Sequence, residues 1–271
     1  MAYDYFSRGG KILPIGQAMM PLGNVAYSYG FGVYATIRLS KGKLYFLDEH
    51  CQRLMNSAAI IGLDHPFTAA QVKAAAKELI AQNKAETCNL KILLIGGQAK
   101  DDATLDILCL NPLFPDRKLY KQGAACVTYR YQRNFPGAKT LNMLPSYLAY
   151  RSAKQAGAYD ALLINRDGCV VEGTRTNFLA LKGRTIVSPP AKDILPGVTR
   201  RHVLEVARQT GFQVVEKDIK LTAIGDYDTA CLTSTSSKIL PIRVIDNHDF
   251  GMPTAVLKEL VLGFDRLLAN L

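Results

Sequence analysis

Segments that predict strands alternate with segments of helical periodicity along this chain, and this alternation limits the possible folds more than any other feature. Residues 33–39 have strand character, the Ser-Lys-Gly turn at 40–42 follows, and residues 43–47 return as the second arm of a hairpin. Asp48 is expected to cap a helix, because apolar side chains then recur at helical spacing until Gly62 ends the run. The chain is therefore expected to combine α-helices with β-strands.

The remainder of the first half continues this pattern and ends in a proline-containing break. Further segments predict a helix after Thr68 and strands at 88–96 and 104–110. The stretch NPLFPDRKLYKQG at 111–123 holds two prolines and a glycine, which favour a loop and predict the domain boundary. We therefore expect a small α/β domain over residues 1–120 and a large α/β domain over residues 121–271.

The second half repeats the mixture of strands and helices. Ser146 is a candidate cap for a helix over 146–156, and Gly157 is its expected stop. The other expected elements are a strand near 124–131, a hairpin over 160–173, helices over 198–211 and 254–270, and a buried strand over 229–235. The predicted fold class is α+β, a mixed α/β chain in two subdomains.

Composition excludes several functional classes. The 271 residues carry a formal net charge of +10, but the basic residues are dispersed, and no nucleic-acid-binding signature is recognisable. A dispersed positive field suits an anionic small molecule at least as well as a nucleic acid. No apolar run is long enough to span a bilayer, and the N-terminal residues lack the apolar core of a signal peptide, so we expect a cytoplasmic protein without a membrane partner.

The cysteine and histidine positions point to neither a disulfide framework nor a metal centre. The six cysteines are widely separated and are expected to be small buried hydrophobic residues. The four histidines show no spacing typical of metal ligands, so no metal site is predicted.

Six segments in a fixed order resemble the class IV, or fold-type IV, pyridoxal-phosphate enzymes. They are YGFGVYATIR at 29–38, EHCQRL at 49–54, AKTLNMLPSYLA at 138–149, DGCVVEGTRTNFL at 167–179, ILPGVTR at 194–200 and LTSTSSKILPI at 232–242. That family contains branched-chain aminotransferases, D-amino-acid aminotransferases and aminodeoxychorismate lyase. The resemblance implies a two-subdomain fold like that of D-amino-acid aminotransferases. It also implies a homodimer and pyridoxal 5'-phosphate bound at the domain interface.

Lys139 is the candidate catalytic residue. A lysine that forms a Schiff base must lose its proton, and the apolar neighbours Leu141, Met143 and Leu144 are compatible with the desolvation that this requires. The resemblance implies that Lys139 bonds covalently to the cofactor. It also implies that Lys139 moves a proton between the substrate Cα and the cofactor C4′.

Glu172 and Arg53 are the candidate partners of the cofactor's two charged ends. Glu172 occupies the position of the family's glutamate beside the pyridine nitrogen, where a carboxylate keeps the ring protonated. Arg53 stands three residues after His50, as in the family's HxxR motif, and its guanidinium can bind a phosphate with two donors.

The segment LPGVTR at 195–200 leads into a predicted helix, whose N-terminal N–H groups can bind an anion. By resemblance, Val198 and Thr199 bind the cofactor phosphate, and Leu195 packs against the cofactor ring. Thr235 matches a phosphate-binding threonine, and Ser234 and Ser236 are nearby candidates in the same hydroxyl cluster.

The candidate substrate pocket contains Tyr34, Thr36, Arg175 and Ser236, and its signals conflict. Phe31 and Ala35 replace the aspartate and glutamate that the family usually has in its GDGVFE segment. Branched-chain enzymes have a tyrosine at the position of Leu144, and the leucine here resembles the D-amino-acid enzymes. Thr36, in contrast, resembles the lyase subgroup. Arg175 is either a substrate-carboxylate ligand or a surface residue.

The resemblance implies a transaminase of class IV that moves an amino group between a small amino acid, branched-chain or D-, and a 2-keto acid. The alternative is 4-amino-4-deoxychorismate lyase, which releases pyruvate in the synthesis of 4-aminobenzoate and folate. Both reactions use the same lysine and the same cofactor. The substrates are in either case small molecules.

Overall fold

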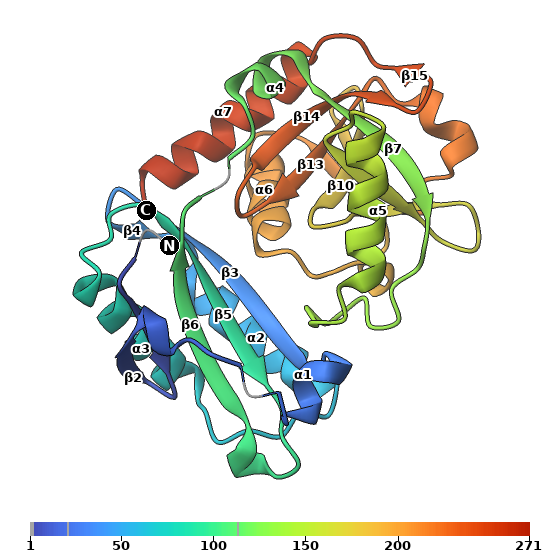
Figure 1. Cartoon of the computed structure of the whole chain (residues 1–271). Coiled ribbons are helices and arrows are strands. Elements are labelled where there is room, and N and C mark those ends of the chain that lie inside the picture. Colours follow the sequence, from blue (N-terminus) through green and yellow to red (C-terminus); the bar gives the residue numbers. More distant parts are fainter. Residues whose placement is uncertain (1–2, 21, 113) are drawn as a thin grey trace. The chain divides into compact units, whose positions relative to one another are not determined.

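The computed structural model describes residues 3–20, 22–112 and 114–271, which form two compact units (Figure 1). The first unit contains the described residues up to Pro112 together with Gly137–Met143. The second unit contains Phe114–Pro136 and Leu144–Leu271. The start of the predicted small domain, Met1 and Ala2, lies outside the described residues, as does Leu113 of the predicted boundary segment.

The division into units differs from the predicted boundary between residues 120 and 121, because it falls before Phe114. Helix α4 (Arg117–Gln122) belongs to the second unit, where the Tyr120 hydroxyl donates to the carbonyl oxygen of Ser237 (3.1 Å). The segment that carries Lys139 belongs to the first unit, not to the large domain as predicted.

The first unit is built on a six-stranded antiparallel sheet in the order β2-β1-β6-β5-β3-β4. Its strands are β1 (Tyr5–Arg8), β2 (Lys11–Pro14), β3 (Gly32–Ser40), β4 (Lys43–Leu44), β5 (Cys88–Ile95) and β6 (Thr104–Leu110). Three of them, β3, β5 and β6, confirm strands that the sequence predicted. The predicted second arm of the hairpin is shorter than expected, because β4 ends at Leu44.

Two helices, α2 (Leu47–Ile60) and α3 (Ala69–Gln82), pack on one face of this sheet. Alternate residues of β3, among them Val33, Ala35 and Ile37, are buried in the core that the helices share with β5 and β6. Successive side chains of a strand point to opposite faces, so Tyr34 and Thr36 lie on the face away from these helices. Short helices η1 (Ile15–Gln17), α1 (Val25–Tyr29) and η2 (Lys100–Asp102) complete the unit.

The start of α2 differs from the prediction. The helix begins at Leu47 after Phe46, whose φ of 56° is left-handed, and no side chain caps it. Asp48 therefore lies within the first turn, where its carboxylate forms an ion pair with Lys73 (2.7 Å). The start of α3 confirms its prediction, because the Thr68 hydroxyl accepts a hydrogen bond from the Gln71 N–H as part of a capping box.

Gly137–Met143 joins the first unit by pairing with the start of β3. The Lys139 carbonyl accepts a hydrogen bond from the Tyr34 N–H (2.9 Å), and the Leu141 N–H donates to the Gly32 carbonyl (2.8 Å). A side chain at position 32 would clash, because an added Cβ would lie 2.7 Å from Leu141 Cδ1 and 2.9 Å from the carbonyl oxygen of Leu94. Glycine at this position thus permits the approach that holds Lys139 beside β3.

The second unit is built on a nine-stranded sheet that follows the path β12-β11-β10-β13-β14-β7-β8-β9, with β15 beside β14. Strand β9 also pairs with β10, so the path from β10 to β9 closes on itself. The strands are β7 (Ala124–Arg130), β8 (Asp160–Ile164), β9 (Val170–Gly173), β10 (Asn177–Lys182), β11 (Thr185–Ser188), β12 (Gln213–Glu216), β13 (Thr229–Ser234), β14 (Lys238–Ile245) and β15 (His248–Asp249). The β8–β9 hairpin confirms the one predicted over 160–173.

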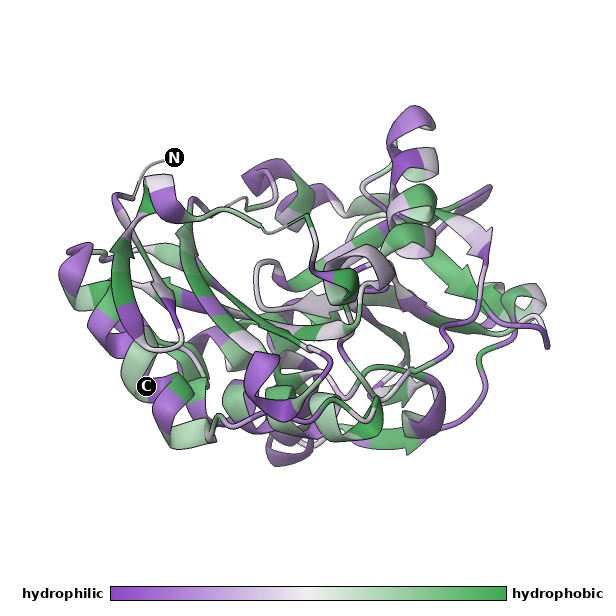
Figure 2. Cartoon of the chain, turned by 60° about the horizontal axis from the view of Figure 1, so that its bottom comes forward, coloured by the Kyte–Doolittle hydropathy of each residue, from purple (hydrophilic) through white to green (hydrophobic). Residues whose placement is uncertain are grey.

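The larger helices of the second unit are α5 (Leu144–Gln155), α6 (Val198–Gln209) and α7 (Ala255–Ala269), with short turns η3 (Ala191–Asp193) and η4 (Leu221–Asp226). Helix α5 begins at Leu144, so Ser146 is buried within its first turn. The prediction that Ser146 caps this helix is therefore wrong. Pro145 is tolerated there because the first helical residues have no N–H acceptor within the helix. Figure 2 shows that the strands are largely hydrophobic, whereas the helices carry hydrophilic and hydrophobic stretches.

All six cysteines are free and buried, which confirms the prediction that they act as small apolar residues. Among the residues that the structure describes, no helix has the length and apolar character needed to cross a membrane. No group of three or more potential metal ligands is brought together in the same described residues.

Candidate functional site

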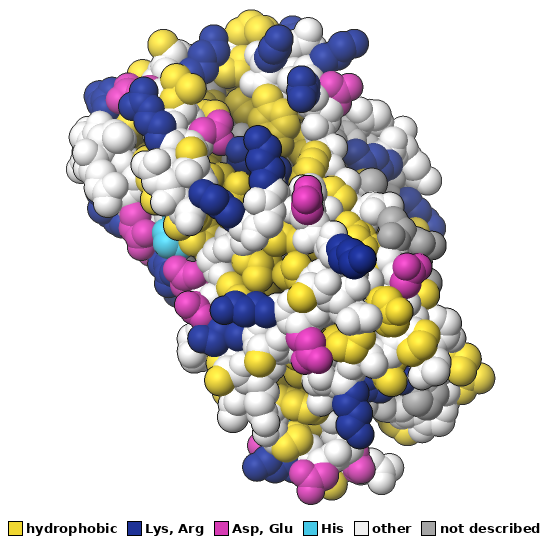
Figure 3. All heavy atoms as spheres, turned by 90° about the vertical axis from the view of Figure 1, so that its left-hand side faces the viewer, with side chains coloured by type: hydrophobic (Ala, Val, Ile, Leu, Met, Phe, Trp, Pro, Cys, Tyr) yellow, Lys and Arg dark blue, Asp and Glu magenta, His cyan; other side chains and the backbone are white. Residues whose placement is uncertain are grey.

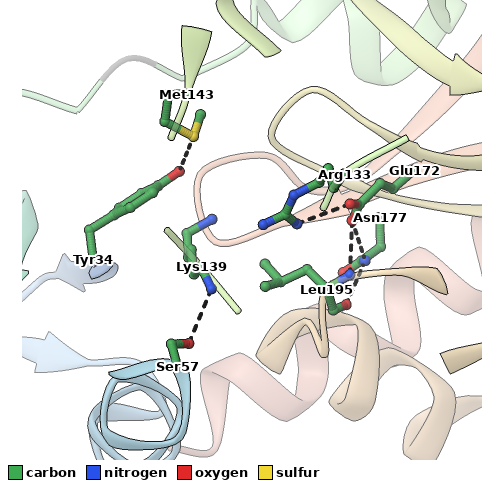
Figure 4. Close-up of polar contacts among 8 residues, drawn as sticks. All are labelled: Tyr34, Ser57, Arg133, Lys139, Met143, Glu172, Asn177 and Leu195. Atoms are coloured by element: carbon green, nitrogen blue, oxygen red, sulfur yellow. Dashed lines mark hydrogen bonds and ion pairs between the residues drawn. The ribbon is translucent and has the colours of Figure 1, made fainter. Parts of the chain in front are cut away.

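Lys139 is held by its backbone on two sides within the first unit. Its N–H donates to the buried Ser57 hydroxyl on α2 (3.1 Å), and its carbonyl accepts from the Tyr34 N–H on β3. The half-buried side chain ends above the Tyr34 ring, with Nζ 4.6 Å from the ring centroid (Figure 4). A backbone that is hydrogen-bonded at both its N–H and its carbonyl, together with a long flexible side chain, suits an amine that must reach more than one atom.

Tyr34 is buried and is contacted both at its hydroxyl and over its ring. Its hydroxyl donates to Met143 Sδ (3.5 Å), and a second ammonium, Lys91 Nζ on β5, lies 3.7 Å from the ring centroid (Figure 4 shows the contact to Met143). Both ammonium groups are within the distance at which a cation is attracted to an aromatic ring.

Lys91 is a candidate residue that sequence reasoning missed. It pairs in register with Thr36, so Lys91, Thr36 and Tyr34 lie on the same face of the sheet. The available signal was a single charged residue within the largely apolar strand CNLKILLI. The structure thus adds a positive charge to the predicted substrate-pocket residues of the first unit.

The departures from the family's GDGVFE segment fall outside this face. Ala35 is buried in the core on the opposite side of β3, against the helices. Phe31 packs on the edge of the same core, and an added Cβ on Gly96 would lie 2.4 Å from its ring. Both substitutions are therefore accommodated by apolar packing within the first unit.

Arg53 lies on the face of α2 that carries Ser57. His50, Arg53 and Ser57 follow one another at spacings of three and four residues, which places them on one side of a helix. The buried His50 ring contacts the guanidinium, with His50 Nδ1 3.4 Å from Arg53 Nη2. Because Ser57 accepts the Lys139 N–H, the predicted phosphate ligand lies on the helix face beside the predicted Schiff-base lysine.

Glu172 is buried in the second unit and forms three polar contacts (Figure 4). Its Oε1 forms an ion pair with Arg133 Nη1 (3.0 Å). Its Oε2 accepts from the Leu195 N–H (3.1 Å) and, more weakly, from Asn177 Nδ2 (3.4 Å). With 4% of the residue exposed, these donors are what makes a buried negative charge tolerable.

Arg133 and Asn177 are further residues that the sequence reasoning did not single out. Asn177 pairs in register with Glu172, and its amide also donates to the Leu195 carbonyl (2.9 Å), which ties three neighbours together. Arg133 lies between β7 and the Lys139 segment, in an irregular stretch without a periodic pattern. Of these two residues, only Asn177 could have been recognised from the sequence as a site residue, because it lies in the motif EGTRTN that also contains Glu172.

The start of α6 has the features of an anion site. Gly197 caps the helix without a side-chain hydrogen bond, and the first backbone bond of the helix runs from the Arg201 N–H to the Gly197 carbonyl. The N–H groups of Val198 and Thr199 thus precede the helical ladder, and both residues are buried, as is Leu195. Glycine is required at 197, because a Cβ there would lie 1.9 Å from Asn177 Oδ1.

The hydroxyl cluster after β13 divides into two parts. The hydroxyls of Ser234 and Ser237 contact each other (2.6 Å), and Ser234 also accepts the Ser237 N–H, so Ser234 serves the turn. Thr235 and Ser236 lie between them and are half-buried. Ser234 is therefore less suited to a phosphate than Thr235, the residue that the motif predicted.

Arg175 is exposed and stacks on α5, with its Cζ 4.2 Å from the centroid of the Tyr150 ring. This contact accounts for the side chain without a substrate. Its role as a carboxylate ligand remains a prediction.

Comparison with known proteins agrees with the motifs. A sequence model of the family described as Amino-transferase class IV matches residues 32–245. The chain is 32% identical over 251 residues to the D-alanine aminotransferase of Bacillus licheniformis, covering 89% of this chain and 88% of the relative. It is 30% identical over 269 residues to a putative branched-chain-amino-acid aminotransferase of Methanocaldococcus jannaschii, covering 92% of each.

Solved structures share the fold. The branched-chain aminotransferase of the archaeon Thermoproteus uzoniensis, solved with norvaline, superposes with a TM-score of 0.90 at 25% identity, covering 99% of this chain and 95% of that one. A further branched-chain amino acid aminotransferase, solved with pyridoxamine 5'-phosphate, superposes with a TM-score of 0.91 at 24% identity and the same coverage. The fold class predicted from the sequence, a mixed α and β chain of fold type IV, is confirmed.

Proposed function

This chain belongs to the class IV aminotransferase family, and we propose that it transfers an amino group between an amino acid and a 2-keto acid, with a branched-chain or D-amino acid as the donor. The observation that carries this proposal is the buried Glu172 carboxylate with its three donors in the second unit. Burying a carboxylate costs desolvation free energy. In a family that uses a pyridinium cofactor, such a carboxylate can stabilise the protonated ring nitrogen.

The residues fit pyridoxal phosphate by the chemistry of their donor sets. The first unit offers an amine at Lys139 and a guanidinium at Arg53, and the second offers a carboxylate at Glu172 and a helix N-terminus at Thr199. These groups match an aldehyde, a pyridinium and a phosphate. When bound, the cofactor supplies an aldehyde that bonds to amines and a ring that accepts electrons from the substrate Cα.

Lys139 is proposed to hold the cofactor and then to move a proton. After the substrate amine takes its place, the Lys139 amine accepts the proton from the substrate Cα and returns it at cofactor C4′. The Tyr34 ring beneath Nζ supports this transfer, because a ring face attracts an ammonium without fixing the direction of its N–H groups.

Glu172 is proposed to hold the proton on the pyridine nitrogen. Its orientation comes from Arg133, Leu195 and Asn177, so it requires no rearrangement when charge develops during the reaction. Leu195 then has two proposed roles, since its N–H orients Glu172 and its side chain packs against the ring.

The phosphate is proposed to bind Arg53, the N–H groups of Val198 and Thr199, the Thr199 hydroxyl and Thr235. Arg200 does not join them in this proposal, although it lies in the same helical turn. Its guanidinium is already bound to Ser188 Oγ (2.9 Å) and Glu216 Oε1 (2.9 Å).

The substrate is proposed to contact Tyr34, Thr36 and Lys91 on the face of the first sheet that lies away from α2 and α3, with Arg175 and Ser236 as further candidates. Lys91 carries the positive charge that a substrate carboxylate requires. The relatives reported above are named aminotransferases, which does not favour the lyase reading that Thr36 suggested.

We also propose that the protein is a cytoplasmic homodimer. Among the described residues between positions 19 and 29, five large apolar side chains are exposed, namely Met19, Met20, Leu22, Val25 and Tyr29. Such a cluster suits a protein partner.

The Lys and Arg side chains on the face in Figure 3 are interspersed with acidic and apolar ones, a distribution unlike a nucleic-acid-binding patch.

A screen of amino donors against keto acceptors tests the function. D-alanine, L-leucine and aminodeoxychorismate are supplied in turn, with 2-oxoglutarate and pyruvate as acceptors for the two amino acids. We expect a yellow protein whose visible absorption band disappears with borohydride, and transfer from at least one of the two amino acids. A colourless protein that does not take up pyridoxal phosphate, or one that only releases pyruvate from aminodeoxychorismate, would contradict the proposal.

A further inference from the structure

Asp160 is a buried carboxylate that the proposed reaction does not use. It is the first residue of β8, and 2% of it is exposed. Burial raises the pKa of the Asp160 carboxyl, an effect opposed by hydrogen bonds and by the charge of Arg175. A buried acid without a part in the chemistry needs another reason to be retained.

Both oxygens of Asp160 bind the turn between β9 and β10. Oδ1 accepts from the Thr174 hydroxyl (2.5 Å), from the Thr174 N–H (3.3 Å) and from the Ala161 N–H (2.9 Å). Oδ2 accepts from the Thr176 hydroxyl (3.1 Å). Three of these four donors belong to the turn, so the carboxylate acts as its anchor.

Gly173 allows the carboxylate to approach the turn this closely. An added Cβ at this position would lie 2.7 Å from Asp160 Oδ2 and 2.2 Å from Thr176 Oγ1. The Gly173 N–H donates to the Thr176 carbonyl (2.9 Å), which closes the turn. The glycine of the Glu-Gly pair is therefore required by the space that the Asp160 carboxylate occupies, since its φ is not in the left-handed region.

The two ends of this turn are the residues that form the Glu172 site. Glu172 and Asn177 pair in register where β9 meets β10, immediately before and after the anchored residues. Asn177 Nδ2 contacts Glu172 and the Leu195 carbonyl, so a shift of the turn would change the position of Glu172 and of its donor together.

We propose that Asp160 is a positioning residue for the transamination reaction: it anchors the turn Gly173–Thr176 and thereby fixes Glu172 and Asn177. The inference rests on the proposed role of Glu172 at the pyridine nitrogen. Its physical basis is that preorganised charges stabilise a transition state only while their positions are held, and misplacement by about 1 Å can cost about 100-fold in rate.

The test is a double-mutant cycle between Asp160→Asn and Glu172→Gln, measured as the single-turnover rate constant of the holoenzyme. We expect Asp160→Asn to slow the wild-type reaction by about 10- to 100-fold and to change KM little, because it displaces Glu172. In the Glu172→Gln background the same substitution should cost less than about twofold, since residues that act through one another are not additive. Equal losses in both backgrounds, or no loss in either, would overturn the inference.

Hydrogen exchange of the cofactor-free protein measures the anchoring independently of catalysis. Peptides that cover residues 172–177 should exchange faster in Asp160→Asn than in wild type. The matched control is Asp167→Asn, whose exposed side chain lies in the turn of the β8–β9 hairpin and should leave this exchange unchanged. Unchanged exchange in Asp160→Asn would also overturn the inference.

Thr176→Val provides a milder break if Asp160→Asn does not fold, because it removes one donor to Oδ2 and preserves the shape of the side chain. Thr176→Val should slow the reaction in the wild-type background and have a smaller effect in the Glu172→Gln background. Equal losses of rate in both backgrounds would again overturn the inference. A wild-type protein that binds no cofactor would contradict the proposed function, and hydrogen exchange would then still decide whether Asp160 anchors the turn.

Discussion

The surroundings of Lys139 in the first unit and of Glu172 in the second differ in how they hold a charged group. Glu172 lies at a strand pairing and receives donors from Arg133, Leu195 and Asn177. Lys139 lies in an irregular segment, and its Nζ rests above the Tyr34 ring. The carboxylate is held at its functional atoms by directional donors, whereas the lysine is held at its backbone and its amine meets a ring face.

This difference corresponds to the two proposed tasks. A carboxylate that stabilises charge works best when it is fixed before the reaction starts. An amine that holds a cofactor and then carries a proton between two carbon atoms must change its own position. Substitutions at Lys139, Glu172, Arg53 and Tyr34 test this division.

Removing the mobile group should have the largest effect. Lys139→Ala deletes the amine that binds the cofactor and moves the proton, so turnover should fall by about 10⁴-fold, the upper range for a positioned acid–base group. Borohydride should no longer attach the cofactor to the chain, as measured by intact mass. Lys100→Ala, at an exposed lysine of the same unit, is the control and should behave as wild type. A cofactor still trapped on the Lys139→Ala chain would show that another lysine bears it.

Neutralising the fixed group should have the next largest effect. Glu172→Gln keeps the shape but no longer holds the ring proton as a carboxylate does, so kcat should fall by about 10²–10³-fold, by comparison with the loss of an oxyanion-hole donor. KM should change much less, because the contact matters chiefly in the transition state.

Single-turnover kinetics measures this loss, and the visible cofactor band verifies folding. Asp218→Asn removes an exposed acid of the same unit and should leave the rate unchanged. A Glu172→Gln enzyme of full rate would exclude Glu172 from the site.

Arg53→Ala should weaken cofactor binding and affect chemistry less than the two changes above. Loss of a charge-assisted phosphate contact costs about 1–3 kcal/mol, which is several-fold to a few hundred-fold in affinity. Titration of the cofactor-free protein measures this loss. The cofactor affinity of Arg53→Lys should lie between those of wild type and Arg53→Ala, because an ammonium retains the charge without the two-donor geometry. Equal cofactor affinity in all three proteins would contradict the phosphate role.

Changes at Tyr34 should have the smallest effect and report on the support beneath Lys139. Tyr34→Phe keeps the ring and loses only the contact to Met143, so kcat should stay within about threefold of wild type, equivalent to about 0.6 kcal/mol. Tyr34→Leu removes the ring under both ammonium groups and should cost about 0.5–2 kcal/mol, the range of a cation–π contact. If Tyr34→Leu retained full kcat, the Tyr34 ring would have no part in positioning the Lys139 amine.

Local patterns were sufficient for most of the regular structure. The apolar strands β5 and β6, the start of α3 after Thr68 and the β8–β9 hairpin were predicted because each depends on residues near one another in sequence. Predictions were wrong where a cap depended on a local candidate alone. Asp48 and Ser146 both lie within the first turn of a helix that starts earlier.

The motifs similarly identified candidates but not their partners. Lys139, Glu172 and Arg53 were recognisable from short segments, whereas Lys91, Arg133 and Asp160 were not. Lys91 acquires its proposed role only because β5 pairs with β3, and Asp160 only because β8 brings it under a turn. Such contacts join residues that are distant in the chain, and no local pattern encodes them.

The family, the mixed α and β class and the residue types available for the chemistry could be read from the amino-acid sequence, because they depend on short-range patterning and motif order. Folding was needed to show that Gly137–Met143 belongs to the first unit, although its chain neighbours on both sides belong to the second. The segment pairs with β3, and this pairing places Lys139 above Tyr34. The tertiary structure also decided that the Asp160 carboxylate supports the turn after Glu172. Backbone pairing and burial between distant segments set these positions, and they exist only once the chain has folded.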